Sequence, residues 1–312
     1  MTEMNFDVVI LGGGPAGFSA ALYCCRSELK SAVIDTNMMG GQPSNYLEIE
    51  NYPGFKRIGG YELMEKFEEH ADMFNVEKFS MQEITSVNLV SEPKIIKTKE
   101  HTFKASSVII ATGAKPMKLG VKGETEFVGR GVSYCAVCDG AFYKDKVVAV
   151  VGGGNSAVEE AIYLTRFVNK VYLVHRRDEL RADKIIQERA FSNNKIEFVW
   201  NSVVDEIIGD EVVSSIRLRN TKSNEYTNLN IDGVFPYIGI VPNSELFSGQ
   251  IEQDSKGFIV TNSTMETSIK GVYAVGDVRN TPLRQVVTAA SDGAVAGVYA
   301  SKYVQALSEV KI

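Results

Sequence analysis

The 312-residue chain has few cysteines and even fewer histidines, which limits the kinds of site it can contain. Four cysteines are too few for the disulfide framework of a small secreted domain. Cys24 and Cys25 are adjacent, so they do not supply the second spaced pair that a four-thiolate zinc site needs. His70, His101 and His175 show no His-x-x-x-His spacing. The sequence therefore predicts no metal site.

The chain also lacks an excess of positive charge and long apolar runs. With 33 basic and 39 acidic side chains its formal net charge is −6, which argues against nucleic acid as a partner, because phosphate binding needs a basic face. No apolar run approaches the ~20 residues that span a bilayer. Residues 1–7 (MTEMNFD) contain two acidic residues and no basic one, unlike a signal peptide. We therefore expect a cytoplasmic protein that binds neither nucleic acid nor membrane.

The chain does contain a dinucleotide-binding pattern near its start. Residues 6–11 (FDVVIL) predict a buried strand that runs into residues 12–17, the first glycine loop, and then into a helical pattern. Gly12 allows the tight turn, Gly14 lets a pyrophosphate approach the backbone, and Gly17 lets helix and strand pack closely. The next strand ends at Asp35, whose carboxylate can accept hydrogen bonds from ribose hydroxyls.

The same pattern recurs at an offset of 140 residues. A predicted strand at 146–151 runs into residues 152–157, the second glycine loop, and a helix follows. This internal repeat predicts a second dinucleotide site. Here the acid at Asp35 is replaced by His175, followed by three arginines that can pair with a 2′-phosphate: Arg176, Arg177 and Arg181. We therefore predict NADPH at this site; the alternative is a solvated basic face.

Between the two loops lies Cys135-Ala136-Val137-Cys138-Asp139-Gly140, the redox segment. Two thiols at this spacing can close a disulfide ring and reopen it, or form half of a metal site, which the composition disfavours. A disulfide does not accept hydride efficiently, whereas a flavin does and then delivers two electrons to a disulfide. We therefore assign FAD to the first glycine loop.

The order of these patterns predicts an α/β fold with two Rossmann-like domains, the NADPH domain being inserted into the FAD domain. We place the FAD domain at residues 1–115 and 244–312, and the NADPH domain with the redox segment at 116–243. Within the first, residues 60–74 predict an amphipathic helix with His70 on the surface and an inward face of Leu63, Met64, Phe67, Ala71 and Phe74. Cys24 and Cys25 are predicted core residues.

These residues together resemble the low-molecular-weight, bacterial-type thioredoxin reductases over essentially the whole chain. The matching stretches are GGQ at 40–42, IENYPG at 49–54, ATG at 111–113, CAVCDG at 135–140, HRRDELR at 175–181, GD at 276–277 and RQVVTAA at 284–290, together with both glycine loops. Departures are small, with Asn155-Ser156 where Asp is frequent and Asp35 where Glu is common.

The resemblance and the two loops together predict the site residues. FAD contacts are expected from Gly12, Gly14, Pro15, Ala16, Gly17, Asp35, Gly40, Gly41, Gln42, Asn51, Ala111, Thr112, Gly113, Gly276, Asp277, Arg284, Gln285 and Val286. NADPH contacts are expected from Gly152, Gly154, Asn155, Ser156, Ala157, Glu159, His175, Arg176, Arg177 and Arg181. The resemblance implies that Cys138 faces the flavin, that Cys135 attacks the substrate disulfide and that Asp139 is the acid/base; Asp139 could instead cap a helix or form a turn.

The resemblance also implies a homodimer, with thioredoxin as the protein substrate. The nicotinamide and the redox segment must each reach the flavin. We therefore expect a domain rotation about the two places where the chain passes between the domains, near 113–117 and 242–246. Related flavoproteins fit less well. The alkyl hydroperoxide reductase flavoprotein carries an extra N-terminal domain, ferredoxin–NADP reductases of this fold lack the CxxC, and ferredoxin-dependent flavin thioredoxin reductases are expected to lose the second loop. A non-catalytic redox sensor remains an alternative of another class.

Overall fold

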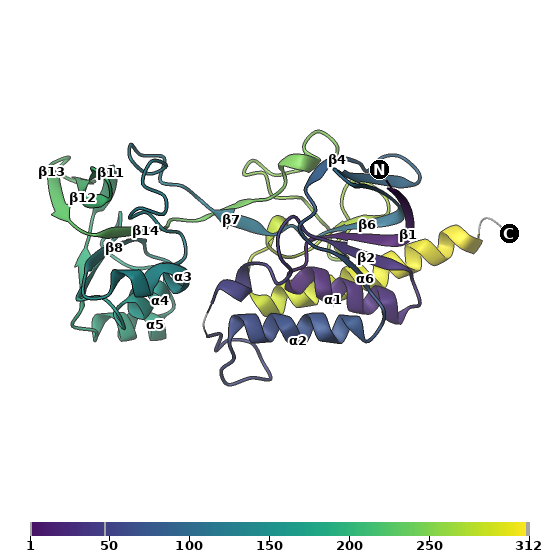
Figure 1. Cartoon of the computed structure of the whole chain (residues 1–312), viewed down its shortest axis with the longest axis horizontal. Helices are drawn as coiled ribbons and strands as arrows, with labels where there is room; N and C mark the ends of the chain where they lie inside the picture. Colours follow the sequence, from purple (N-terminus) through teal and green to yellow (C-terminus); the bar gives the residue numbers. More distant parts are fainter. Residues whose placement is uncertain (1, 47, 310–312) are drawn as a thin grey trace. The chain divides into compact units, whose positions relative to one another are not determined.

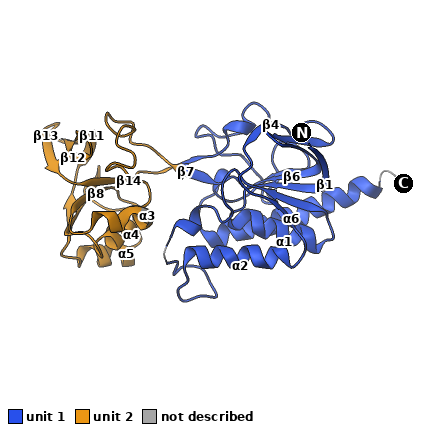
Figure 2. Ribbon diagram, viewed as in Figure 1, with its two compact units in different colours: residues 1–115, 241–312 blue, residues 116–240 orange. Residues whose placement is uncertain are grey.

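The structure is a computed structural model that describes residues 2–46 and 48–309, apart from the side chain of Cys138. It divides into two compact units, shown in different colours in Figure 2. Unit 1 combines residues 1–115 with residues 241–312, and unit 2 is the continuous segment 116–240. Chain order therefore inserts unit 2 into unit 1. The sequence placed the second boundary slightly later, after residue 243.

Unit 1 is built on a mixed sheet with the strand order β3-β2-β1-β6-β5-β4, in which β16 also pairs with β6. The strands are β1 Thr2–Leu11, β2 Ser31–Ile34, β3 Glu77–Phe79, β4 Ile84–Asn88, β5 Lys94–Thr98, β6 His101–Ile110 and β16 Val272–Ala274. The pairs β1–β2, β2–β3, β1–β6 and β6–β16 are parallel, whereas β4–β5 and β5–β6 are antiparallel. All four residues of β2 are buried, as expected of a parallel strand covered on both faces.

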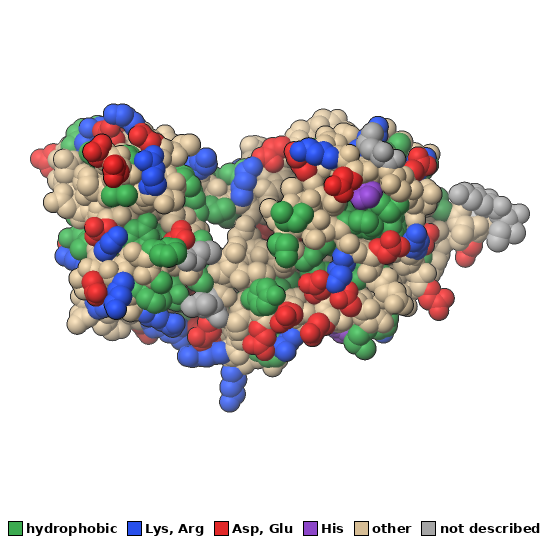
Figure 3. Space-filling view, viewed as in Figure 1, with side chains coloured by type: hydrophobic (Ala, Val, Ile, Leu, Met, Phe, Trp, Pro, Cys, Tyr) green, Lys and Arg blue, Asp and Glu red, His purple; other side chains and the backbone are tan. Residues whose placement is uncertain are grey.

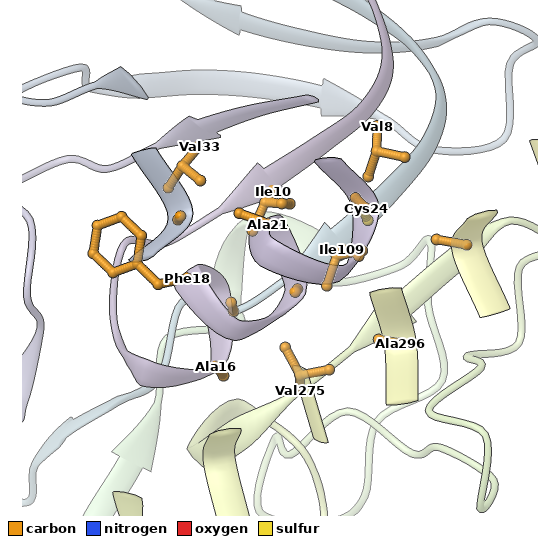
Figure 4. Packing of buried hydrophobic residues seen from close by; sticks show 14 of the residues in the cluster. Val8, Ile10, Ala16, Phe18, Ala21, Cys24, Val33, Ile109, Val275 and Ala296 are labelled. Carbon is orange, nitrogen blue, oxygen red and sulfur yellow. The ribbon is translucent and has the colours of Figure 1, made fainter. Parts of the chain in front are cut away.

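One face of this sheet is covered by three helices, α1 Pro15–Arg26, α2 Gly60–Asp72 and α6 Val286–Glu309 (Figure 1). Figure 4 shows α1 packed between the sheet residues Val8, Ile10 and Val33 and the C-terminal residues Val275 and Ala296. The opposite face is covered by a second cluster that includes Phe247, Ile251 and Ile259. Residues from both ends of the chain therefore build one core.

Helices α1 and α6 pack unusually closely because α6 presents glycines to α1. A Cβ atom added at Gly293 would lie 2.1 Å from the carbonyl oxygen of Ala16, and one at Gly297 would lie 2.9 Å from that of Ala20. Only a residue without a side chain allows two helix backbones to approach in this way. The C-terminal segment thus completes unit 1.

The predicted helix faces are confirmed. On α2, Leu63, Met64 and Ala71 are buried, Phe67 is partly buried against the core, and His70 is exposed. The helix ends at Asp72, two residues earlier than predicted, so Phe74 packs against the core from the turn that follows it. On α1, Cys24 and Cys25 are buried free cysteines. Burial raises the pKa of both thiols, first by desolvation, so neither is readily ionised. Both cysteines are core residues, as predicted.

Unit 2 repeats the plan of unit 1 on a smaller scale. Its parallel sheet has the order β10-β9-β8-β14, and a three-stranded antiparallel sheet, β11-β12-β13, packs beside it. The strands are β8 Val147–Gly152, β9 Lys170–Val174, β10 Ile196–Val199, β11 Ser202–Gly209, β12 Val213–Asn220, β13 Tyr226–Asn230 and β14 Gly233–Tyr237. The helices are α3 Ala136–Asp139, α4 Asn155–Leu164 and α5 Lys184–Phe191.

The internal repeat extends to the turns. Helix α1 begins at Pro15 and α4 begins at Asn155, again 140 residues apart. Gly12 and Gly152, which open the two loops, both have positive φ, of 114° and 156°. The same strand, loop, helix and strand therefore occur in both units. Short 3-10 helices complete the fold: η1 Gln42–Asn45, η2 Gly140–Tyr143, η3 Glu245–Phe247 and η4 Gly276–Val278.

The chain passes between the units along two short strands that pair with each other, β7 Ala114–Pro116 and β15 Ile240–Pro242. On the unit 1 side the connection is fastened by Asn243. Its backbone N–H donates to the carbonyl oxygen of Gly113 at 3.0 Å, and its side-chain amide donates to that of Thr112 at 2.8 Å. Within residues 2–46 and 48–309, no helix is long and apolar enough to cross a membrane.

A buried carboxylate on α4 makes the stability of unit 2 depend on pH. Glu160 is 5% exposed, and its Oε2 has no hydrogen-bond partner among the described residues. Burial, and then the charge of Glu159, raise the pKa of Glu160 from 4.5 to about 7. The folded protein therefore holds this proton more tightly than the unfolded chain, and stability falls as the pH rises from 4.5 through about 7.

We expect Glu160→Gln to stabilise unit 2 by roughly 2 kcal/mol at pH 8. Each pH unit between the unfolded and folded pKa values of Glu160 costs the folded protein about 1.4 kcal/mol when the carboxyl is ionised, and a neutral amide removes only part of this cost. The gain should vanish near pH 4.5. Urea unfolding followed by the fluorescence of Trp200, the single tryptophan and a unit 2 residue, measures this. Glu188→Gln, an exposed change on α5, is the control. Equal stability of Glu160→Gln and the original protein at pH 8 would contradict the expectation.

Candidate active site

The first glycine loop brings the N-terminus of α1 to the end of the β-sheet. A Cβ atom at Gly12 would lie 2.2 Å from the carbonyl oxygen of Ala111, and one at Gly17 would lie 1.8 Å from that of Gly12. These two glycines are therefore required by the packing of the loop itself. At Gly14, the N-cap of α1, an added Cβ meets nothing closer than 3.9 Å. That glycine instead leaves space in front of the helix N-terminus, where backbone N–H groups favour a phosphate.

A second pair of glycines forms the other side of this space. Gly40 and Gly41 both have positive φ, of 117° and 63°. A Cβ atom at Gly41 would lie 3.1 Å from the Cα of Gly14. The two backbones thus face each other with no side chain between them. We call these four residues, Gly13, Gly14, Gly40 and Gly41, the glycine cradle. Without side chains, its backbone allows the pyrophosphate group of a ligand to approach closely.

Asp35 lies beside the cradle and already supports the loop. Its Oδ2 accepts a hydrogen bond from the N–H of Gly13 at 2.7 Å, and its Oδ1 accepts one from the N–H of Asn37 at 2.8 Å. A carboxylate oxygen has capacity for a further donor, so a ribose hydroxyl can still bind. Asp35, which the sequence predicts to bind a ribose, therefore also fixes the shape of the first glycine loop.

Other predicted FAD contacts converge from distant parts of unit 1. The side-chain amide of Asn51 donates to Gln285 Oε1 at 2.9 Å, which joins two matched motifs 234 residues apart. The amide of Gln42 reaches the carbonyl oxygen of Ala114 at 3.5 Å. Gly276 approaches Ala16 of α1, where an added Cβ would lie 3.2 Å from the alanine methyl. Pro15 is the first residue of α1, and Thr112 Oγ1 donates to the carbonyl oxygen of Asn243 at 2.7 Å.

Asp277 and Arg284 form the charged part of this region. Burial raises the pKa of Asp277, an effect that the guanidinium of Arg284 opposes and Asp292 reinforces. The guanidinium of Arg284 stacks on the ring of Phe258 at 4.2 Å, and its buried Nε has no acceptor among the described residues. An unpaired buried donor is consistent with a ligand acceptor at this point. Val286, in contrast, packs against the apolar cluster of Ile49, Ile58 and Leu63.

One supporting residue of this region is not predicted from the sequence. Asp292, largely buried on α6, accepts hydrogen bonds at Oδ2 from the N–H of Gly276 at 3.1 Å and from Arg279 Nη1 at 3.0 Å. It therefore fixes the turn that carries Gly276 and Asp277. In the sequence, the signal that could have indicated this role of Asp292 is its position as a lone carboxylate within a helical run of small residues.

In unit 2 the second glycine loop has the same architecture as the first. An added Cβ at Gly154 meets nothing within 4 Å, so the N-terminus of α4 is open in the same way as that of α1. Asn155 exchanges two hydrogen bonds of 2.8 Å with Asp183, and the N–H of Arg181 donates to the carbonyl oxygen of Gly153 at 2.6 Å. Ser156 and Glu159 are exposed on the first turns of α4, whereas Ala157 is buried.

His175 and the arginines lie beside this loop. The ring of His175 is 4% exposed and lies against Gly153, where an added Cβ would be 2.4 Å from the ring. Burial, and then the charges of Arg181, Arg176 and Arg177, lower the pKa of His175, so the ring is neutral at pH 7. The three arginines are exposed. Among residues 2–46 and 48–309 none of them forms an ion pair, which leaves their guanidinium groups available to a phosphate.

The redox segment begins where the short helix α3 starts. Cys135 is disulfide-bonded, whereas Cys24 and Cys25 are free; the side chain of Cys138 lies outside the described part of the structure. The N–H of Cys135 donates to Ser133 Oγ at 3.1 Å, and the N–H of Ala136 donates to the phenol oxygen of Tyr237 at 3.0 Å. Both sides of Cys135 are therefore held by side chains that the sequence patterns do not single out.

Asp139 is half-buried and is the last residue of this helix. It occupies the N-cap position of η2, yet its side chain makes no cap hydrogen bond there. The Asp139 side chain therefore does not cap η2. Its charge contributes to raising the pKa of Tyr143, after the larger effect of burial. No group of three or more His, Cys, Asp or Glu side chains that could hold a metal ion is present among the described side chains.

Comparison with known proteins places this arrangement in a family. Residues 6–293 match the family model described as pyridine nucleotide-disulphide oxidoreductase. The chain is 48% identical over 308 residues to the thioredoxin reductase of Listeria innocua, covering 98% of this chain and 96% of that protein. It is 48% identical over 308 residues to the thioredoxin reductase of Bacillus subtilis, covering 98% and 97%. Among solved structures, Lactococcus lactis thioredoxin reductase in the FR conformation matches with a TM-score of 0.94 and 47% identity, covering 96% of this chain and 99% of that one.

Proposed function

The chain belongs to the pyridine nucleotide-disulphide oxidoreductase family, and we propose that it is an NADPH-dependent flavoprotein that reduces the disulfide of thioredoxin. The observation that carries this proposal is the disulfide-bonded Cys135, which lies in the same unit as an open glycine loop flanked by arginines. A thiol pair and a nucleotide site within one inserted unit are what a disulfide reductase needs. Its curated relatives at 48% identity are thioredoxin reductases.

The residues of unit 1 fit FAD. The glycine cradle and the N-terminus of α1 suit the pyrophosphate, Asp35 has remaining acceptor capacity for a ribose, and Arg284 offers a buried unpaired donor. The residues of unit 2 fit NADPH in the same way, with the three free arginines suited to the 2′-phosphate. Flavin and nicotinamide bound at these sites would supply the hydride transfer that the protein side chains cannot perform.

The redox segment performs the exchange with thioredoxin. In the reduced protein, the Cys135 thiolate attacks one sulfur of the thioredoxin disulfide, forming a mixed disulfide and releasing the other thioredoxin sulfur as a thiolate. Cys138 then attacks Cys135 in the mixed disulfide, which restores the protein's own disulfide and frees thioredoxin as a dithiol. Asp139 holds and returns the proton of the second thiol. These roles are assigned by resemblance to the family.

A domain rotation belongs to the same proposal. The redox segment must reach both the flavin and a protein substrate, and the nicotinamide must also reach the flavin, which one fixed arrangement does not allow. The paired strands β7 and β15 are the two chain crossings, and Gly113 and Gly239 beside them have positive φ, of 67° and 147°. Short paired strands flanked by glycines are suitable hinges.

Dimerisation and location complete the proposal. We infer a homodimer from the resemblance, and light scattering of the purified protein tests it directly. A cytoplasmic location agrees with the small number of cysteines, because a reducing compartment cycles a CxxC instead of leaving it closed. On the face drawn in Figure 3, acidic and basic side chains are interspersed over both units.

The test of this function is NADPH-dependent reduction of an aromatic disulfide reporter, measured with and without a purified bacterial thioredoxin. We expect fast reporter reduction only when thioredoxin is present, because the redox segment then passes its electrons to the protein substrate. A yellow protein that oxidises NADPH and ignores thioredoxin would contradict the proposal. That outcome would direct attention to another disulfide partner or to a sensor function.

The arginines beside the second glycine loop should set the choice of nicotinamide. We expect Arg176→Gln together with Arg177→Gln to raise the KM for NADPH by at least about 100-fold, since two charge-assisted hydrogen bonds to a phosphate, each worth roughly 1.5–3 kcal/mol, are lost. The KM for NADH should change little, because NADH has no 2′-phosphate. Arg166→Gln is the matched control. Arg166 is an exposed arginine two residues after the C-terminal end of α4, the end opposite to the glycine loop. An equal rise in both KM values would show that the arginines do not read the phosphate.

A further inference from the structure

Tyr134 and Glu124 form a hydrogen-bonded pair beside the redox segment. The carboxylate of Glu124 is 1% exposed and accepts three hydrogen bonds. Its Oε1 accepts from the N–H of Leu119 and from the phenol of Tyr134, and its Oε2 accepts from the N–H of Gly120, each at 2.7 Å. Three hydrogen-bond donors compensate the buried Glu124 carboxylate for its lost hydration, so its ionised form is stable in the folded protein without a further partner.

The phenol of Tyr134 acts as a permanent donor to this carboxylate. Burial, and then its hydrogen bond to Glu124, raise the pKa of Tyr134 well above its usual range. The phenol therefore keeps its proton over the whole physiological pH range. A neutral donor bonded to a buried carboxylate is also stronger than an ordinary hydrogen bond between neutral groups.

The position of Tyr134 makes this contact relevant to Cys135, the next residue in the chain. The backbone on both sides of Cys135 is already tied to β14. The N–H of Ser133 donates to the carbonyl oxygen of Val234 at 3.1 Å, and the N–H of Ala136 donates to the phenol oxygen of Tyr237 at 3.0 Å. The side chain of Tyr134 provides a third tie. It reaches Glu124, in the segment that follows β7.

We propose that Tyr134 and Glu124 are positioning residues, which hold the backbone of Cys135 in the geometry needed for thiol–disulfide exchange. This inference rests on the proposed function of the redox segment. Sulfur exchange requires a defined approach of the attacking sulfur to the disulfide, and a displacement of about 1 Å at a reacting atom can cost roughly 100-fold in rate. Their functional groups bond each other and the backbone of Leu119 and Gly120, so we assign both a positioning role and not a catalytic one.

Tyr134→Phe is the direct test, because it removes the phenol hydroxyl and keeps the ring. Rapid mixing separates two half-reactions, flavin reduction by NADPH and reoxidation of the reduced protein by thioredoxin. We expect reoxidation to slow by about five- to tenfold, within the range that a small misplacement causes, and flavin reduction to stay unchanged. Tyr226→Phe is the matched control. Tyr226 is an exposed tyrosine of β13 in the same unit, and its ring lies under Arg217.

A second measurement does not depend on turnover. The rate of alkylation of Cys135 by iodoacetamide in the chemically reduced protein, mapped by mass spectrometry across pH, reports the environment of the thiol. We expect this rate to change at least about threefold in Tyr134→Phe and to stay constant in Tyr226→Phe. Glu124→Gln should reproduce the change. If that variant fails to fold, because its amide would face the N–H of Leu119 or Gly120, Tyr134→Phe decides alone.

Two results would overturn the inference. One is reoxidation and alkylation of Tyr134→Phe at the rates of the original protein. The other is an equal loss in both half-reactions together with a lower Tm, which would indicate a general structural role. Failure of the proposed function is recognised separately, since the unaltered protein would then not reduce thioredoxin, while the alkylation rates would still test the positioning.

Discussion

Replacing Cys135 by serine is expected to lower NADPH-dependent reduction of thioredoxin by at least about 1000-fold, because a hydroxyl at neutral pH cannot take the place of a thiolate in sulfur exchange. Cys138→Ser should do the same, since a mixed disulfide could then form but not be resolved. Both variants should still bind FAD and oxidise NADPH when an artificial electron acceptor is added, because the glycine loops are untouched. Steady-state rates with and without thioredoxin measure both halves of this expectation.

The chain provides its own control for this experiment. Cys25 is a buried free cysteine of α1, and Cys25→Ala removes one thiol without touching the redox segment. Its activity should stay within about twofold of the original protein, with only a small loss of stability, because the change removes little buried volume. Retained thioredoxin reduction in Cys135→Ser, or a matching loss in Cys25→Ala, would refute the assigned thiol roles.

The second large effect concerns two glycines of the first glycine loop that differ in what surrounds them. Gly17→Ala is expected to destabilise unit 1 by about 3 kcal/mol or more, because the new methyl would lie 1.8 Å from the carbonyl oxygen of Gly12 and the backbone must shift. Gly14→Ala has room for its methyl in the protein itself, with the nearest atom at 3.9 Å. It should leave the apoprotein about as stable as before and instead weaken FAD binding.

The two variants are therefore controls for each other. Thermal unfolding of the apoproteins by circular dichroism, and the flavin content and flavin release of the holoproteins, give two independent readouts. Gly17→Ala should lower the unfolding temperature in the absence of FAD, whereas Gly14→Ala should lower only the flavin content. Full FAD binding by Gly14→Ala would mean that the pyrophosphate does not lie in the glycine cradle.

Local sequence patterns were sufficient for the parts of the fold that repeat. The two glycine loops, the helices after them and the inward face of α2 follow from residue spacing, because a buried strand, a turn without side chains and an amphipathic helix each leave a short signal. The boundaries differ by a few residues. Helix α4, for example, begins at Asn155, although its apolar pattern is recognisable only from Val158.

Contacts between distant segments could not be predicted in this way. The hydrogen bond from Asn51 to Gln285 joins residues 234 positions apart, and nothing near either residue indicates the other. The same holds for Asp292, which supports the turn at Gly276, and for the pair formed by Tyr134 and Glu124. Polar residues inside a domain are placed by tertiary packing, so their partners become visible only in three dimensions.

The close packing of α1 against α6 has a consequence for how the protein is made. Unit 2 is one continuous segment, so it can fold as soon as the ribosome has released it. Unit 1 cannot, because the glycines of α6 and the strand β16 that complete its core are translated last. The first half of unit 1 must therefore wait while unit 2 folds, with the apolar surface that α6 covers still exposed and one edge of β6 unpaired. Loading of the flavin then becomes an event that follows the end of translation.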